Sequence, residues 1–164
     1  MRKWLLLMIS IGILSACLTG KNNAVQSNLE VDKTETSRQN VESSSEEEEM
    51  KIKITVNQTE FWIIPENNAA SQAFISQLPL EIKMADVNGN EKFFLFDQTF
   101  PTEEIRPGQI HSGDLMLYGD SGLVLFYKDF SSFYSYTRLG RMEDANGLEQ
   151  ILGKGATRVV FEVE

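Results

Sequence analysis

Hydrophobic and polar residues alternate along most of the chain after residue 50, with the two-residue period of a half-buried β-strand. In the clearest run, Ile52, Ile54 and Val56 are separated by Lys53 and Thr55. Alternating runs, and short apolar runs bounded by turn residues, predict strands at 51–56, 59–64, 80–87, 92–96, 113–118, 123–127, 134–142 and 157–163. Because successive strands are joined by tight turns, this order favours a small closed β-barrel of about eight strands.

Two further segments carry apolar residues at helical spacing. Residues 69–78 form one apolar stripe, which Asn67 or Asn68 can cap and which a proline ends. Residues 144–152 have the same spacing, and Gly153 is well placed as a C-terminal stop. The predicted fold is therefore mainly β, a closed barrel with two short helices covering its open ends.

The region from residue 113 to residue 142 is rich in aromatic side chains, which can fill a core or form an exposed patch. The longest irregular connection predicted, 97–109, lies just before it, and long loops on a rigid sheet often carry binding residues. The aromatic cluster consists of Phe126, Tyr127, Phe130, Phe133, Tyr134 and Tyr136.

The start of the chain predicts an export signal. Two basic residues precede an apolar run at 4–14, which is shorter than the about 20 residues of a spanning helix. The following Leu14-Ser15-Ala16-Cys17 resembles the lipobox of bacterial lipoproteins, in which the Cys thiol is joined to diacylglycerol and the preceding peptide bond is cut. Cys17 is the only cysteine, so the alternative is a free thiol in an ordinary signal peptide. We expect a cleaved signal at 1–16 and a lipid anchor in the bilayer, on the extracytoplasmic face of a bacterial cell membrane.

Residues 17–50 are mostly polar and carry four consecutive glutamates at 46–49, which predicts a disordered acidic tether before a folded domain at 51–164. A metal-binding acidic tail is the weaker alternative, because its carboxylates have no fixed geometry. Removing Arg2 and Lys3 from the 15 basic residues leaves 13 against 24 acidic ones, a net charge of −11. With no basic patch, nucleic acid is not an expected partner.

The order of two strands, a helix, a run of strands, a second helix and a last strand resembles the cyclophilin barrel. Three runs resemble cyclophilin motifs: 113–116 resembles Gly-x-Leu-x-Met, 122–126 resembles Gly-Ser-Gln-Phe-Phe, and 139–142 resembles Phe-Gly-Lys-Val. The runs Leu-x-Leu-Phe-Tyr at 123–127 and Tyr-Ser-Tyr-Thr-Arg-x-Gly-Arg at 134–141 are similar to those of small bacterial cyclophilin-like domains. The resemblance covers most of residues 51–164.

The resemblance implies prolyl isomerase activity only if the catalytic residues of cyclophilins are present. In those enzymes an arginine in a Phe-His-Arg motif polarises the prolyl amide. The corresponding region, 91–100, contains neither Arg nor His. Arg106–Gln109 loosely resembles the motif, but the distance in sequence between its Arg and its Gln is much too short. We therefore expect no catalytic residues and a module that binds a peptide or small ligand. The alternatives are a weak prolyl isomerase that folds exported proteins, and a structural partner of another envelope protein.

The resemblance also suggests where a ligand would bind. By this resemblance, Phe126 corresponds to a phenylalanine that lines the substrate pocket of cyclophilins, and Tyr136 corresponds to a histidine that contacts their substrate. For both residues the alternative is packing in the barrel wall. Arg138 and Arg141, three apart on a strand, are predicted to point to opposite faces. The other ligand-binding candidates are His111 and Tyr118. One histidine and one lipidated cysteine make no zinc site, so neither a metal nor a cofactor is expected.

Overall fold

The computed structural model describes residues 50–164. The predicted signal peptide, the lipidation site Cys17 and the acidic tether up to residue 49 lie outside the described residues. Within the part of the chain that is described, neither helix is long and apolar enough to cross a lipid bilayer.

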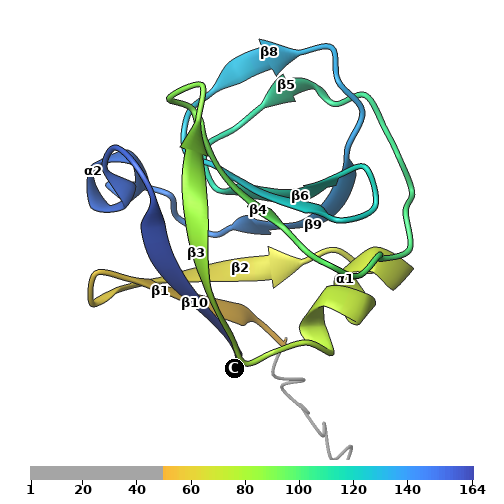
Figure 1. Ribbon diagram of the computed structural model, residues 1–164, viewed down its shortest axis with the longest axis horizontal. Coiled ribbons are helices and arrows are strands. Elements are labelled where there is room, and N and C mark those ends of the chain that lie inside the picture. Colours follow the sequence, from red (N-terminus) through yellow and green to blue (C-terminus); the bar gives the residue numbers. More distant parts are fainter. Residues whose placement is uncertain (1–49) are drawn as a thin grey trace, which may run out of the picture. The chain divides into compact units, whose positions relative to one another are not determined.

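Eight antiparallel strands close into a barrel, in the spatial order β1-β10-β3-β4-β7-β6-β9-β2 (Figure 1). A closed barrel leaves no unpaired strand edge for another chain to extend. The predicted mainly β, closed eight-stranded barrel with two helices is confirmed. The barrel strands are β1 (Ile52–Val56), β2 (Thr59–Pro65), β3 (Leu80–Val87), β4 (Glu91–Leu95), β6 (Asp114–Tyr118), β7 (Gly122–Phe126), β9 (Thr137–Met142) and β10 (Thr157–Val163).

The alternation along each strand decides which side chains fill the barrel. In β1, Ile52, Ile54 and Val56 are fully buried in the main core, and the residues between them are partly exposed. Ile54 lies opposite Phe161 of β10 and Phe61 of β2, so three neighbouring strands contribute to one layer of the core. A slip of one residue would turn these side chains to solvent, which is why the apolar period fixes the register.

The first helix, α1 (Ala69–Ile75), begins where the sequence predicts. The side chain of Asn68 accepts a hydrogen bond from the backbone N–H of Ser71 at 2.8 Å, which satisfies one of the free donors of the first turn. Phe74 is fully buried, and its ring meets that of Phe161 edge to face at 5.6 Å. The helix is thereby packed against the barrel core.

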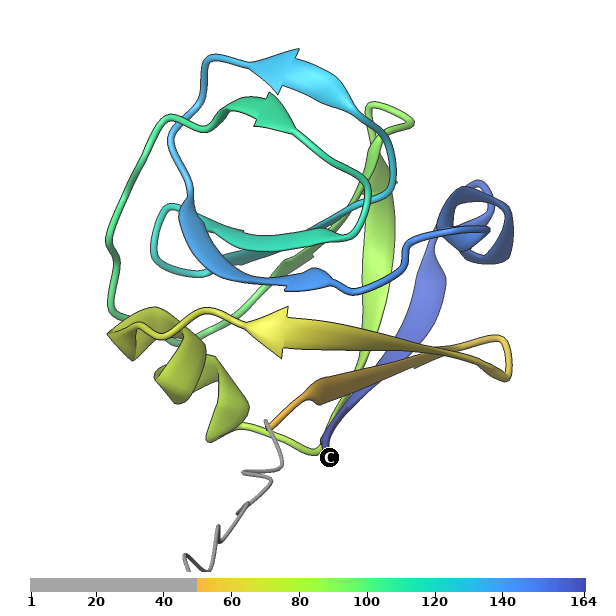
Figure 2. The same cartoon turned by 180° about the vertical axis from the view of Figure 1, so that it is seen from behind.

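Both helices are shorter than predicted. α1 ends at Ile75 because the backbone N–H groups of Gln77 and Leu78 bond to carbonyls three residues back and close a tight turn. α2 (Leu148–Leu152) begins four residues late, because the Asp144 carboxylate accepts a hydrogen bond from the N–H of Asn146 at 2.8 Å and holds a turn. In Figures 1 and 2 the two helices lie on opposite sides of the barrel.

Two short strands that the sequence pattern does not predict, β5 (Gly108–Ile110) and β8 (Phe130–Ser132), pair with each other outside the barrel. Figures 1 and 2 show this ribbon on the side of the barrel away from β1. A second apolar cluster joins the ribbon to the outer face of β6 and β7, so these strands are buried on both faces. The buried members of this cluster are Ile110, Met116, Val124, Phe126 and Tyr136.

Candidate ligand-binding pocket

A pocket of about 300 Å³ adjoins the second apolar cluster on the outer face of the barrel. Its walls come from the facing ends of β3 and β4, from β6 and β7, and from the segment that leads into β9. The volume is at the lower limit of small-molecule sites, which span about 300–1,000 Å³. The lining residues are Val87, Asn88, Glu91, Phe93, Tyr118, Val124, Tyr134 and Tyr136.

Three tyrosines form one wall of the pocket. The ring of Tyr118 meets Tyr134 edge to face at 6.0 Å and Tyr136 at 5.8 Å with a tilt of 53°. Tyr118 is 48% exposed and Tyr134 is 64% exposed, whereas Tyr136 is only 4% exposed. The wall therefore has a buried base, Tyr136, and an open rim of two aromatic rings.

Another part of the pocket lining depends on a glycine. A Cβ atom at Gly122 would lie 2.8 Å from the ring of Phe93, closer than real side chains approach. The missing side chain leaves room for the Phe93 ring on the outer face of β7, where Phe93 pairs with Val124 in register. Both residues line the pocket.

Glu91 provides the only carboxylate among the lining residues, and no Arg, Lys or His of residues 50–164 lines the pocket. Its carboxylate makes no hydrogen bond or ion pair with the described residues. Partial burial raises the pKa of Glu91 above its usual value, because desolvation disfavours the charged form. Burial likewise raises the pKa of Tyr136, and the nearby Glu91 carboxylate raises it further.

Only two of the residues predicted to bind a ligand meet in this pocket, Tyr118 and Tyr136. Phe126 is fully buried and does not line it. Its ring packs behind Tyr136 at 5.4 Å, edge to face, so it supports the tyrosine from the barrel wall. Of the two roles considered for Phe126, the structure favours packing.

Arg141 and His111 lie apart from the pocket, around the buried carboxylate of Asp114. Arg141 Nε donates to Asp114 Oδ1 at 2.5 Å, and the His111 backbone N–H donates to Oδ2 at 2.9 Å. The hydrogen bond to Asp114 raises the pKa of Arg141. Because Asp114 is fully buried and already has these partners, the group stabilises the junction of β5, β6 and β9 and leaves no carboxylate open to a ligand.

Arg138 lies at a separate hollow of about 220 Å³, which Glu66 and Glu103 also line. The prediction that Arg138 and Arg141 point to opposite faces is wrong. They pair with Met116 and Asp114, which are two residues apart and share the outer face, and the register shifts between the two pairs. The extra residue of this bulge brings both arginines to the outside of the barrel.

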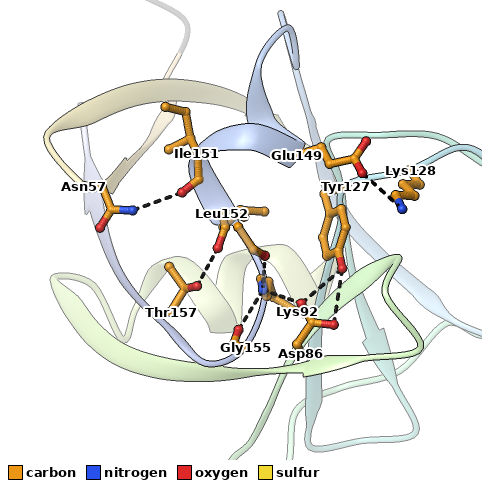
Figure 3. A network of polar contacts seen from close by, with 11 residues as sticks. Asn57, Asp86, Lys92, Tyr127, Lys128, Glu149, Ile151, Leu152, Gly155 and Thr157 are labelled. Carbon is orange, nitrogen blue, oxygen red and sulfur yellow. Dashed lines mark hydrogen bonds and ion pairs between the residues drawn. The ribbon is translucent and has the colours of Figure 1, made fainter.

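A polar network on the other face of β4 also escaped prediction (Figure 3). Lys92 is fully buried, and its Nζ donates to Asp86 Oδ2 at 2.6 Å, to the Gly153 carbonyl at 2.9 Å and to the Gly155 carbonyl at 2.8 Å. The Tyr127 hydroxyl donates to Asp86 at 3.1 Å, and burial together with Asp86 raises the pKa of Tyr127 to about 12. With all three ammonium hydrogens bonded, Lys92 ties the loop after α2 to the barrel.

Six lining residues were not among the predicted binding residues: Val87, Asn88, Glu91, Phe93, Val124 and Tyr134. The two-residue period places Glu91 and Phe93 on one face of β4, and this was the only indication in the sequence that they act together. What the sequence lacks is the information that β4 pairs with β7 and lies near Tyr118 and Tyr136. Within residues 50–164, no group of three or more His, Cys, Asp and Glu side chains could hold a metal ion.

By its fold, this protein is a closed antiparallel β-barrel with an aromatic pocket on its outer face. The sequence profile of the cyclophilin-like family matches residues 54–164, so the chain belongs to that family. It is also similar to a hypothetical protein of Archaeoglobus fulgidus, known from a solution structure. The identity is 18%, the TM-score is 0.48, and the match covers 70% of this chain and 94% of the other. A comparison with curated proteins gives no significant match.

Proposed function

We propose that this protein is a ligand-binding module that holds a peptide or small ligand in the outer pocket and does not isomerise prolyl bonds. The observation that carries the proposal is the pocket itself, which combines an aromatic wall, an apolar wall and one carboxylate. Concave, mostly apolar sites with a few polar groups are typical of ligand binding.

The composition of the pocket argues against prolyl isomerisation. A cyclophilin-type mechanism needs a cation that polarises the prolyl amide, and none of the arginines or lysines in the described range lines the pocket. Arg141 is bound to Asp114, and Arg138 lies at the separate hollow. A carboxylate in place of the cation would repel the developing negative charge on an amide oxygen rather than stabilise it.

The proposal is tested with a prolyl-peptide isomerisation assay on the full chain. We expect no acceleration over the uncatalysed rate. Acceleration that is lost in Tyr118→Ala and kept in Phe133→Ala would overturn the proposal, because Tyr118 lines the pocket and Phe133 does not. Both side chains are exposed, at 48% and 93%, so neither variant removes a core residue.

We further propose that the module is held at the extracytoplasmic face of a bacterial membrane by acylated Cys17, with the acidic segment as its tether. The support is the lipobox-like run that ends at Cys17. Two acyl chains anchor a protein stably, whereas one binds only marginally. The measurement is membrane fractionation of Cys17→Ser: release into the soluble fraction is expected, and retention on the membrane would refute lipidation.

A second candidate function is a structural contact with another envelope protein. The observation that favours it is Phe133, whose ring is 93% exposed next to the exposed Tyr134. Exposed aromatic side chains are enriched among the residues that dominate protein interfaces. Cross-linking in the envelope that is lost in Phe133→Ala but kept in Tyr118→Ala would favour this role over ligand binding.

A further inference from the structure

The charge of the pocket is one-sided. Glu91 is the only acidic residue in the lining, and no basic side chain of residues 50–164 balances it there. The folded domain as a whole carries 10 basic and 16 acidic residues, so the surrounding field is also negative. An anionic ligand would meet repulsion from both sources, whereas a cation would be attracted.

The Glu91 carboxylate is in an unfavourable state without a ligand. It is partly desolvated, which raises its pKa, and it makes no ion pair or hydrogen bond within residues 50–164. A buried carboxylate is normally paired, since leaving it unpaired costs free energy. A bound cation would supply the missing partner, so part of the ligand's affinity would come from relief of this cost.

The aromatic rings suit the same kind of ligand. Tyr118 and Tyr134 form the open rim, Tyr136 forms the base, and Phe93 also lines the pocket. The faces of such rings attract cations, and quaternary ammonium groups in particular are recognised by aromatic cages. Because an organic ammonium ion is apolar at its edge, it also loses less hydration on entering an apolar pocket than a metal ion does.

We infer that the outer pocket binds a small organic ammonium ion, with its charge between the Glu91 carboxylate and the rings of Tyr118, Tyr134 and Tyr136. This inference rests on the proposed binding function and specifies its ligand class. The volume of about 300 Å³ restricts the occupant to a small molecule.

The test uses choline as the probe and 3,3-dimethylbutan-1-ol as its neutral isostere, titrated into the isotopically labelled full chain and followed by NMR. Choline is expected to shift the amide signals of the pocket strands and to bind about tenfold more tightly than the alcohol. The anion 3,3-dimethylbutanoate, of similar shape, is expected not to bind there.

Variants separate the charge from the shape of the site. Glu91→Gln is expected to weaken choline binding about tenfold and to leave the binding of the alcohol unchanged. Glu60→Gln is the matched control, because Glu60 is an exposed glutamate of β2 outside the pocket, and it should change neither. Tyr118→Leu keeps an apolar side chain at the rim and should weaken choline binding more than alcohol binding.

Two outcomes overturn the inference. Equal affinity for choline and the alcohol, unaffected by Glu91→Gln, would show that the pocket binds ligands but does not select a cation, and would leave the proposed function standing. Preferential binding of the anion would also refute the ammonium inference while preserving a ligand-binding pocket. The proposed function itself fails through a different result, the pocket-dependent acceleration of prolyl isomerisation.

Discussion

Removal of the buried ammonium of Lys92 is predicted to destabilise this barrel, because it leaves a partly buried carboxylate without its cation. The informative change is Lys92→Met, which keeps an unbranched apolar stem and removes the charge. Lys92 has no exposed surface, and its ammonium donates three hydrogen bonds, to Asp86 and to the carbonyls of Gly153 and Gly155 (Figure 3). The variant removes the ammonium donor from all three acceptors, of which Asp86 keeps the hydrogen bond from the Tyr127 hydroxyl.

The size of the effect follows from the burial of these partners. Removing one member of a buried ion pair costs about 3–5 kcal/mol. The Asp86 side chain is 18% exposed, and Gly153 and Gly155 lie on the surface, so water can replace part of what is lost. We therefore expect Lys92→Met to lower the free energy of unfolding by about 3 kcal/mol, at the lower end of that range.

The assay is a double-mutant cycle in urea, with Lys92→Met, Asp86→Asn and the double variant. The loss in the double variant should fall short of the sum by about 1–2 kcal/mol, since the two side chains share one interaction. Lys83→Met is the control: Lys83 is exposed on β3, and its replacement should cost less than about 0.5 kcal/mol. A loss below about 1 kcal/mol for Lys92→Met, or strict additivity, would refute the reasoning.

Three further predictions concern the carboxylates of Asp86 and Glu91 and the glycine Gly140. The hydrogen bond from Lys92 lowers the pKa of Asp86 below 3.8, so its stabilising effect should be present above that pH and lost as the pH falls through the folded value. Urea unfolding of Asp86→Asn should accordingly show a shallower loss in acid, and an unchanged slope would contradict this. The pKa of Glu91 is raised above 4.5 in the folded protein. Its contribution to the free energy of unfolding is therefore fully present below pH 4.5 and is lost as the pH rises through the pKa of the folded state. Glu91→Gln should therefore raise the thermal midpoint at pH 7 but not at pH 4; equal gains at both pH values would contradict the assignment. A Cβ at Gly140 would lie 2.6 Å from both Ile63 Cγ2 and the Ile64 carbonyl oxygen, so Gly140→Ala should cost about 1–3 kcal/mol in urea unfolding, and a neutral effect would contradict the close strand contact.

The sequence was sufficient to predict the barrel, because its strands carry a regular apolar period and its turns are short. The buried positions of β1 follow that period without exception. The helix lengths were not predictable to the same degree: the Asp144 side chain bonds to the backbone of Asn146, and this local competition is not visible in the spacing of apolar residues. The β5–β8 ribbon was missed because strands of three residues are too short to show a period.

The pocket was only partly predictable. Tyr118 and Tyr136 were two of the six ligand-binding candidates and lie in one pocket, whereas Glu91 and Phe93 depend on the pairing of β4 with β7, which no local pattern reveals. The burial of Lys92 could not be predicted either, because a lysine next to a glutamate in the sequence is typical of a position exposed to solvent. Its burial follows from the carbonyls of a loop more than sixty residues away, at separations of 61 and 63 residues.

The central claim, a cyclophilin-like barrel whose outer pocket binds a ligand without isomerising it, is tested most directly by exchange NMR. The ligand is the dipeptide amide alanylprolinamide, which has an ammonium group and an X-Pro bond but no carboxylate, mixed with the full chain. The account predicts shifts at the pocket residues Glu91, Tyr118 and Tyr136, with cis–trans exchange at its uncatalysed rate. Faster exchange that Tyr118→Ala abolishes would contradict it.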